Sequence, residues 1–186
     1  MEALAVSTGV VALAEIGDKT QLLTLVLAAR YRRPWPIVAG IFVATLVNHG
    51  IAGAIGAWLT KAVGPEAMRW ILGLSFLAMA AWMLVPDKLD EDDAAGRKLG
   101  GVFATTTVLF FLVEIGDKTQ IATVALAARF EALAAVVLGT TLGMLLANAP
   151  VAFFGEALAK RLPVRAVHVV AAAVFAAMGV AVLLLG

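Results

Sequence analysis

Four long stretches of this chain contain no charged residue and are built mostly from aliphatic side chains. They cover residues 37–60, 70–86, 132–155 and 166–186. Each is long enough, or nearly so, to cross the hydrocarbon core of a bilayer as a helix, which takes about 20 residues. The 186 residues are 62% hydrophobic and 15% charged, whereas soluble proteins average about half apolar and a quarter charged. The composition therefore excludes a water-soluble globular protein and indicates a small integral membrane protein.

Two further stretches, residues 4–28 and 101–128, are equally apolar except that each has Glu, Asp and Lys near its centre. The first does not read as a signal peptide, because it lacks a basic start and continues as apolar sequence beyond the charges. We expect both stretches to cross the membrane. The predicted fold is an all-α integral membrane protein with six transmembrane helices, which leaves no room for a second folded domain.

The connecting segments are short, and their Lys and Arg residues are unevenly distributed. The predicted loops 30–36, 87–100 and 160–165 together hold nine, against three in segments 61–69 and 129–131. By the positive-inside rule the first group is cytoplasmic and both termini lie outside. The acidic loop 87–100 lacks the spacing of an EF-hand, so we interpret it as a solvated linker. Four tryptophans near span ends are expected to be interfacial anchors: Trp35, Trp58, Trp70 and Trp82.

The chain contains an internal repeat. Residues 15–30 read EIGDKTQLLTLVLAAR and residues 114–129 read EIGDKTQIATVALAAR, identical at 12 of 16 positions with an offset of 99. Each half contains three expected spans, and because three is odd, the second copy must cross the membrane in the opposite sense. The sequence thus predicts a first repeat at 1–86, a cytoplasmic linker at 87–100 and a second, inverted repeat at 101–186.

Each repeat places two acids and a lysine near the middle of its first span: Glu15, Asp18 and Lys19, and Glu114, Asp117 and Lys118. Six such charges facing lipid would cost about 15–20 kcal/mol, so they must face the bundle interior. The i, i+3, i+4 spacing puts each set on one helical face, and four carboxylates can then gather at one depth. With both lysines charged, the cluster has a net charge of minus two, which one divalent cation or two protons would neutralise. A metal ion and protons would therefore compete for the same oxygens.

A purely structural role is the alternative, in which each Asp and Lys pair is an intramembrane salt bridge. That role explains Asp18 with Lys19 but leaves Glu15 and Glu114 unexplained, so we favour a cation path. Gly17 and Gly116 would allow the helix to break within each motif and free backbone carbonyls.

Neighbouring polar residues supply weaker candidates, for which an interhelical hydrogen bond is an equally good interpretation. The second-tier metal ligands are Thr20, Gln21, Asn48, Thr119, Gln120 and Asn148. Asn148 is one residue out of register with Asn48. The residues assigned to charge balance or proton coupling are Lys19, Lys118 and His49.

Ligand chemistry narrows the ion. The chain has no cysteine and one suitably placed histidine, so copper and zinc lack their usual ligands, whereas carboxylate and amide oxygens suit manganese and calcium. No nucleophile with an oriented base is present, so we expect neither an enzyme nor a catalytic cofactor. No basic cluster is dense enough for a nucleic-acid partner.

Two copies of E-x-G-D-K-T-Q, each in the first helix of a three-helix repeat and separated by an acidic loop, resemble the Gdt-type family of cation/proton antiporters. The resemblance covers essentially the whole chain. It implies transport of manganese or calcium against protons, with Glu15, Asp18, Glu114 and Asp117 as the cation-binding acids. The short linker is similar to the compact prokaryotic form, which implies the inner membrane.

We therefore expect a secondary transporter that exports manganese, or alternatively calcium, in exchange for protons, with one repeat rocking against the other. Two other functions stay open from the residues: a passive divalent-cation channel, in which rings of acids select ions, and an exporter of basic amino acids. A homodimer is compatible with the sequence, but two repeats can form a complete site within one chain.

Overall fold

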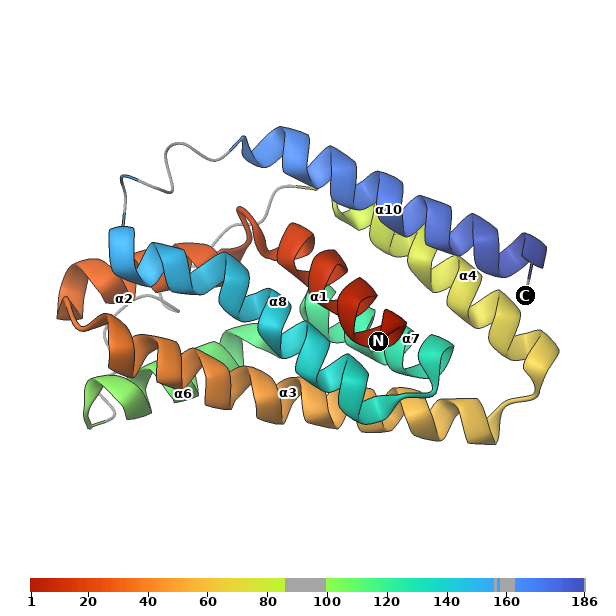
Figure 1. Ribbon diagram of the computed structural model, residues 1–186, viewed down its shortest axis with the longest axis horizontal. Coiled ribbons are helices and arrows are strands. Elements are labelled where there is room, and N and C mark those ends of the chain that lie inside the picture. Colours follow the sequence, from red (N-terminus) through yellow and green to blue (C-terminus); the bar gives the residue numbers. More distant parts are fainter. Residues whose placement is uncertain (86–99, 156, 158–162, 186) are drawn as a thin grey trace.

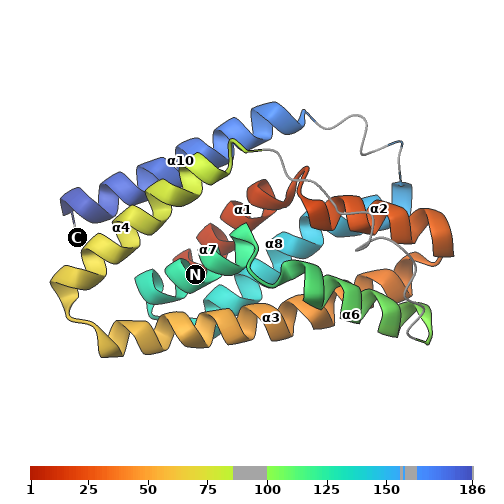
Figure 2. The same cartoon turned by 180° about the vertical axis from the view of Figure 1, so that it is seen from behind.

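The computed structural model describes residues 1–85, 100–155, 157 and 163–185, and α-helix is the regular secondary structure throughout these residues. The expected all-α fold is confirmed. The predicted linker 87–100 lies outside the described residues except for Gly100, as do Lys160 and Arg161 of the predicted last loop. The helices (Figures 1 and 2) are α1 (Glu2–Glu15), α2 (Lys19–Tyr31), α3 (Pro34–Ala62), α4 (Pro65–Trp82), α6 (Val102–Glu114), α7 (Lys118–Phe130), α8 (Leu133–Phe154) and α10 (Val164–Leu185).

Three of the helices, α3, α8 and α10, are long and apolar enough to cross a membrane, with 29, 22 and 22 residues. They correspond to three of the charge-free stretches. The predicted loops 30–36 and 61–69 were too long, because α3 begins at Pro34 and α4 at Pro65. Proline favours the first turn of a helix, where its missing N–H has no partner to lose. Glu66 and Arg69 therefore lie in α4 rather than in a loop.

The two charged stretches are each divided into two helices. The first breaks between α1 and α2 and the second between α6 and α7, at equivalent positions of the motif. Gly17 and Gly116 have φ angles of +85° and +77°, a left-handed conformation that glycine adopts without a Cβ clash. Asp18 and Asp117 then cap the next helices, since their side chains accept hydrogen bonds from the backbone N–H of Thr20 (3.4 Å) and Thr119 (3.5 Å). The motif itself thus ends one helix and starts the next.

The helices of the two halves pack in matching pairs. Helix α1 packs on α8 as α6 packs on α3, and α2 contacts α8 as α7 contacts α3. Helices α3 and α8 also contact each other, and α4 lies along α10, beside α1 and α7 (Figure 1). Gly40 and Gly139, at the repeat offset of 99, both allow a neighbouring helix to pack closely. A Cβ on either would lie within 3.0 Å of the facing helix, at Thr106 and Ser7 respectively.

Gly143 provides a test of this close packing. A Cβ at this position of α8 would lie 2.6 Å from the carbonyl oxygen of Thr8 and 2.9 Å from the amide nitrogen of Ala12, both backbone atoms of α1. We expect Gly143→Ala to push α1 and α8 apart and to lower the free energy of unfolding by about 1–3 kcal/mol. The melting temperature of the detergent-solubilised protein should fall by about 2–10 °C. Gly50→Ala is the control, because a Cβ there meets nothing within 4 Å, and alanine favours the helix. Equal melting temperatures for the two variants would contradict the close approach.

Two hydrophobic clusters fill the interior. One comes mainly from α1, α4, α7 and α10, and the other mainly from α2, α3, α6 and α8. The chain passes from the first to the second between Ala14 and Leu23, and back again between Val113 and Ala122. Both helix breaks lie in these two intervals, so the charged motifs are located where the two apolar clusters meet.

Candidate cation-binding site

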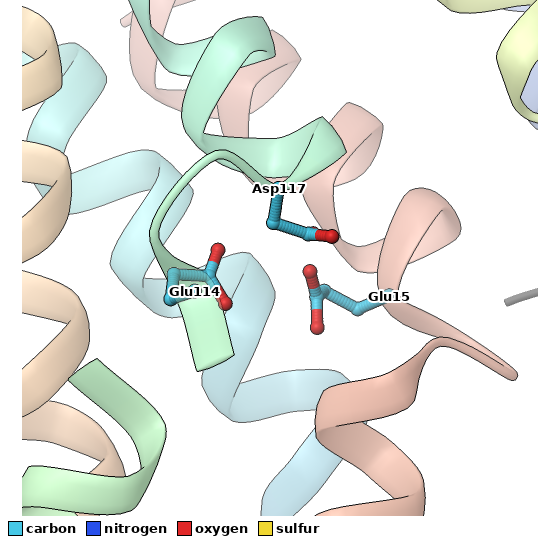
Figure 3. A group of neighbouring side chains, drawn as sticks. All are labelled: Glu15, Glu114 and Asp117. Atoms are coloured by element: carbon cyan, nitrogen blue, oxygen red, sulfur yellow. The ribbon is translucent and has the colours of Figure 1, made fainter. Parts of the chain in front are cut away.

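Three carboxyl groups from the two helix breaks face one another in the interior (Figure 3). They belong to Glu15 at the end of α1, Glu114 at the end of α6 and Asp117 at the start of α7. One ligand atom from each lies within 4.8 Å of the others. The exposed fractions of the three residues are 0%, 2% and 2%. The sequence therefore correctly places acids of both repeats in one location, although they are 99 or more positions apart.

The two glutamates are held in the same way. The hydroxyl of Thr20 donates to Oε2 of Glu15, and the hydroxyl of Thr119 donates to Oε1 of Glu114. Among the described residues, the other oxygen of each glutamate is buried and has no hydrogen-bond partner. Buried polar atoms are normally paired, so these two oxygens beside a third carboxylate are candidate ligands for a cation. The threonine hydroxyls hold the other oxygen of each glutamate, and metal ligation by Thr20 and Thr119 stays a prediction.

The aspartates differ from each other. Asp117 Oδ1 forms an ion pair of 3.0 Å with Nζ of Lys19, which comes from the other repeat. Asp18 is buried as well, but it is outside the group of three carboxylates. The expected cluster of four acids at one depth is thus three acids plus Lys19. Lys118 does not mirror Lys19 in every contact, because its Nζ donates to the carbonyl of Val85 at 3.1 Å.

Asn148 and His49 each approach one of the glutamates. Asn148 Nδ2 lies 3.5 Å from Oε2 of Glu15, and His49 Nε2 lies 3.4 Å from Oε1 of Glu114. The two positions differ by 99, so His49 is the counterpart of Asn148. His49 and Asn148 are both fully buried beside the site.

The remaining amides stabilise the breaks. Gln21 accepts from the backbone N–H of Gly17 (3.0 Å) and donates to the carbonyl of Ala147 (3.0 Å). Gln120 accepts from Gly116 N–H at 2.7 Å and donates to Oδ1 of Asn48. These side chains replace hydrogen bonds that an unbroken helix would have made. Gln21, Gln120 and Asn48 form hydrogen bonds in this structure, and metal ligation by them stays a prediction.

His168 lies in the first turns of α10 and is not among the residues assigned to the site from the sequence. Its Nε2 donates a hydrogen bond of 2.8 Å to the carbonyl of Ile16, a group that the first break leaves outside a helix. The residue at the equivalent position of the first repeat is Arg69, so the repeat itself gave no hint. His168 links α10 to the break beside Glu15.

The charges of the site define its chemistry. Three ionised carboxylates and the Lys19 ammonium together leave two negative charges in a buried location. Oxygen atoms dominate the possible ligands, which suits hard divalent cations such as manganese, calcium or magnesium. Protons bind to the same kind of oxygen, so a divalent cation and protons would compete for these carboxylates.

Comparisons of the sequence with known proteins all point to one family. A family profile described as "Divalent cation/proton antiporter GDT1" matches residues 3–91 and 102–186. A protein of Vibrio cholerae named "Putative manganese exporter" is 50% identical over 182 residues, covering 97% of this chain and 90% of the relative. A GDT1-like protein of Synechocystis is 30% identical over 136 residues, covering 63% of this chain and 66% of the relative. "GDT1-like protein 3" of Arabidopsis thaliana is 26% identical over 200 residues, covering 94% and 68%.

No solved structure matches the chain at a significant level. The family profile covers both motifs and nearly every described helix, and family members are transporters rather than enzymes. Membrane location follows from the same family and from the apolar helices. This chain belongs to the GDT1 family of divalent cation/proton antiporters.

Proposed function

We propose that this chain moves manganese out of the cytoplasm in exchange for protons. The observation that supports this most directly is a pair of buried oxygens on Glu15 and Glu114, beside Asp117, that have no hydrogen-bond partner in the part of the chain that the structure describes. Three oxygen ligands from two separate helix breaks suit a divalent ion that must bind and later leave. The name of the Vibrio cholerae relative favours manganese over calcium as the substrate.

The proposed topology has six membrane spans in two inverted repeats with both termini outside. In this arrangement the first and fourth spans are the broken helices α1–α2 and α6–α7. The matching helix contacts of the two halves support it, as does the excess of Lys and Arg in the predicted loops 30–36, 87–100 and 160–165. Broken helices at the midplane are common ion sites in secondary transporters.

Asp18 has a proposed role in the alternate state. Asp18 and Asp117 occupy equivalent positions, and both cap the helix after the break. When the two repeats exchange conformations, Asp18 replaces Asp117 beside the glutamates. Both glutamates would then hold the metal ion in either state. Asp117 would be the third ligand in one state and Asp18 in the other. His49 is proposed to hold Glu114, as Asn148 holds Glu15.

Proteoliposomes with a pH indicator in the lumen test the function. Mn²⁺ added outside should raise the lumenal pH, because metal enters while protons leave. Acidifying the outside should weaken the response, because protons compete for the carboxylates. Metal uptake without any proton movement would make the protein a channel, and no uptake at all would contradict transport. A response at lower Ca²⁺ than Mn²⁺ concentration would make calcium the substrate.

A further inference from the structure

A cavity of about 570 Å³ lies between the C-terminal ends of α2 and α8. These ends lie together at the end of the molecule away from the C-terminus (Figure 1). The walls are apolar, with Leu25, Val26 and Ala29 from α2 and Phe153 from α8, and among the described residues Arg32 is the charged side chain that lines it. The polar residues of α2, Thr20 and Thr24, are buried instead against the cation site. The cavity is therefore separate from the carboxylates, and an apolar wall with a guanidinium is unsuited to a cation.

The repeat provides an internal comparison. The counterpart of this cavity would lie between α7 and α3, but there the helices are in direct contact. A Cβ on Gly56 would collide with the backbone of α7 at Val124, whereas a Cβ on the equivalent Gly155 would meet nothing within 4 Å. The repeated fold does not require a gap at this location, so among the described residues the cavity belongs to the α2–α8 pair and has no counterpart between α7 and α3.

The C-terminal ends of α2 and α7 also differ in charge. The chain leaves α2 through Arg30, Arg32 and Arg33, all exposed. The equivalent residues after α7 are Arg129, Glu131 and Ala132. Arg32 and Glu131 have the same left-handed backbone, with φ of 51° and 50°, so the turn is shared and only the side chains differ. The cavity thus occurs at the end that has three guanidinium groups.

Aromatic side chains place the cavity at the depth of lipid headgroups. Trp35 is 72% exposed and its ring packs edge-on against Phe153 in the cavity wall, with centroids 5.1 Å apart. Exposed tryptophans prefer the boundary between headgroups and acyl chains. A guanidinium beside that boundary can bind a phosphate through two parallel hydrogen bonds, and the apolar wall can hold an acyl chain.

We propose that this cavity binds one phospholipid with an anionic headgroup. Arg32 binds the phosphate, and an acyl chain packs along Leu25, Val26 and Phe153. This site is additional to cation transport, and it uses none of the residues that hold the metal ion.

Lipid titration of the full-length protein in neutral detergent, followed by native mass spectrometry, tests the proposal. We expect phosphatidylglycerol to bind at least about fivefold more tightly than phosphatidylcholine, and Arg32→Gln to remove that preference. Arg32→Lys should retain most of the preference. The control is Arg129→Gln, which makes the same charge change at the end of α7 and should leave lipid binding unaltered. Equal binding of both lipids, or an unchanged preference in Arg32→Gln, would overturn the proposal.

A second pair of variants tests the apolar wall without changing charge. Ala29 lines the cavity, so Ala29→Leu should fill part of it and weaken phosphatidylglycerol binding about fivefold or more. Ala54→Leu adds the same bulk to an exposed position of α3 and should have no effect. Melting temperatures in neutral detergent identify any variant that fails to fold. If the variants of Arg32 fail to fold, Ala29→Leu tests the proposal, and if Ala29→Leu fails, the variants of Arg32 test it. Equal binding by both leucine variants would show that no acyl chain occupies the cavity.

Discussion

Replacing Glu15 or Glu114 by glutamine is expected to abolish manganese-driven proton movement in proteoliposomes, with a loss on the order of 100-fold or more. Each substitution removes one negative charge and one of the two buried oxygens that have no other partner. The amide oxygen of glutamine can still accept the hydrogen bond from Thr20 or Thr119, so the helix break should be retained. The measurement is the initial rate of lumenal pH change against Mn²⁺ concentration.

Two controls separate loss of the site from loss of the fold. Glu66→Gln removes a carboxylate from the exposed first turn of α4 and should transport normally. Asp117→Asn should lose transport while keeping the start of α7, because asparagine caps a helix as well as aspartate does. Normal transport by both glutamate variants, with unchanged melting temperatures, would show that these acids do not bind the transported ion.

The helical fold and the meeting of the two motifs could be predicted because they depend on patterns visible along the chain. Apolar length predicts the helices, and the offset of 99 relates the two sets of acids. The break at Gly17 and Gly116 was foreseen only as a hypothesis, since glycine permits a left-handed turn without requiring it. The structure shows why it forms: Asp18 and Asp117 cap the following helices, and the neighbouring glutamines bond the free amides.

Details that depend on three-dimensional neighbours were not predictable. His49, and not Asn48, occupies the position equivalent to Asn148, and the sequence alone does not show that the His49 side chain faces a glutamate. His168 reaches the carbonyl of Ile16 only because α10 packs over the first break. The separation of Asp18 from the other three acids is a difference between two halves with nearly identical motifs, so no local pattern could reveal it.

Lys19 is expected to limit how tightly the site holds manganese. Its ammonium lies 3.0 Å from Asp117 Oδ1 and neutralises one of three carboxylates. A metal ion that binds Asp117 must displace this ammonium, and the ammonium favours release when it returns. We expect Lys19→Gln to lower the KM for Mn²⁺ at least tenfold, because no ammonium then competes with the ion for the Asp117 carboxylate. Turnover should fall as well, since release becomes the slow step.

A double-mutant cycle distinguishes this competition from a general effect of losing a lysine. In the Asp117→Asn background, Lys19→Gln should change manganese affinity, measured by equilibrium binding, by less than about threefold, because the pair is already broken. Lys118→Gln is the matched substitution in the other repeat. Because Nζ of Lys118 donates to the carbonyl of Val85 in this state, Lys118→Gln should lower the KM less than Lys19→Gln does. A KM that stays the same or rises in Lys19→Gln would mean that the ammonium only joins the two repeats. A lowered KM with slower turnover would instead identify Lys19 as a tethered cation that competes with the metal ion for Asp117.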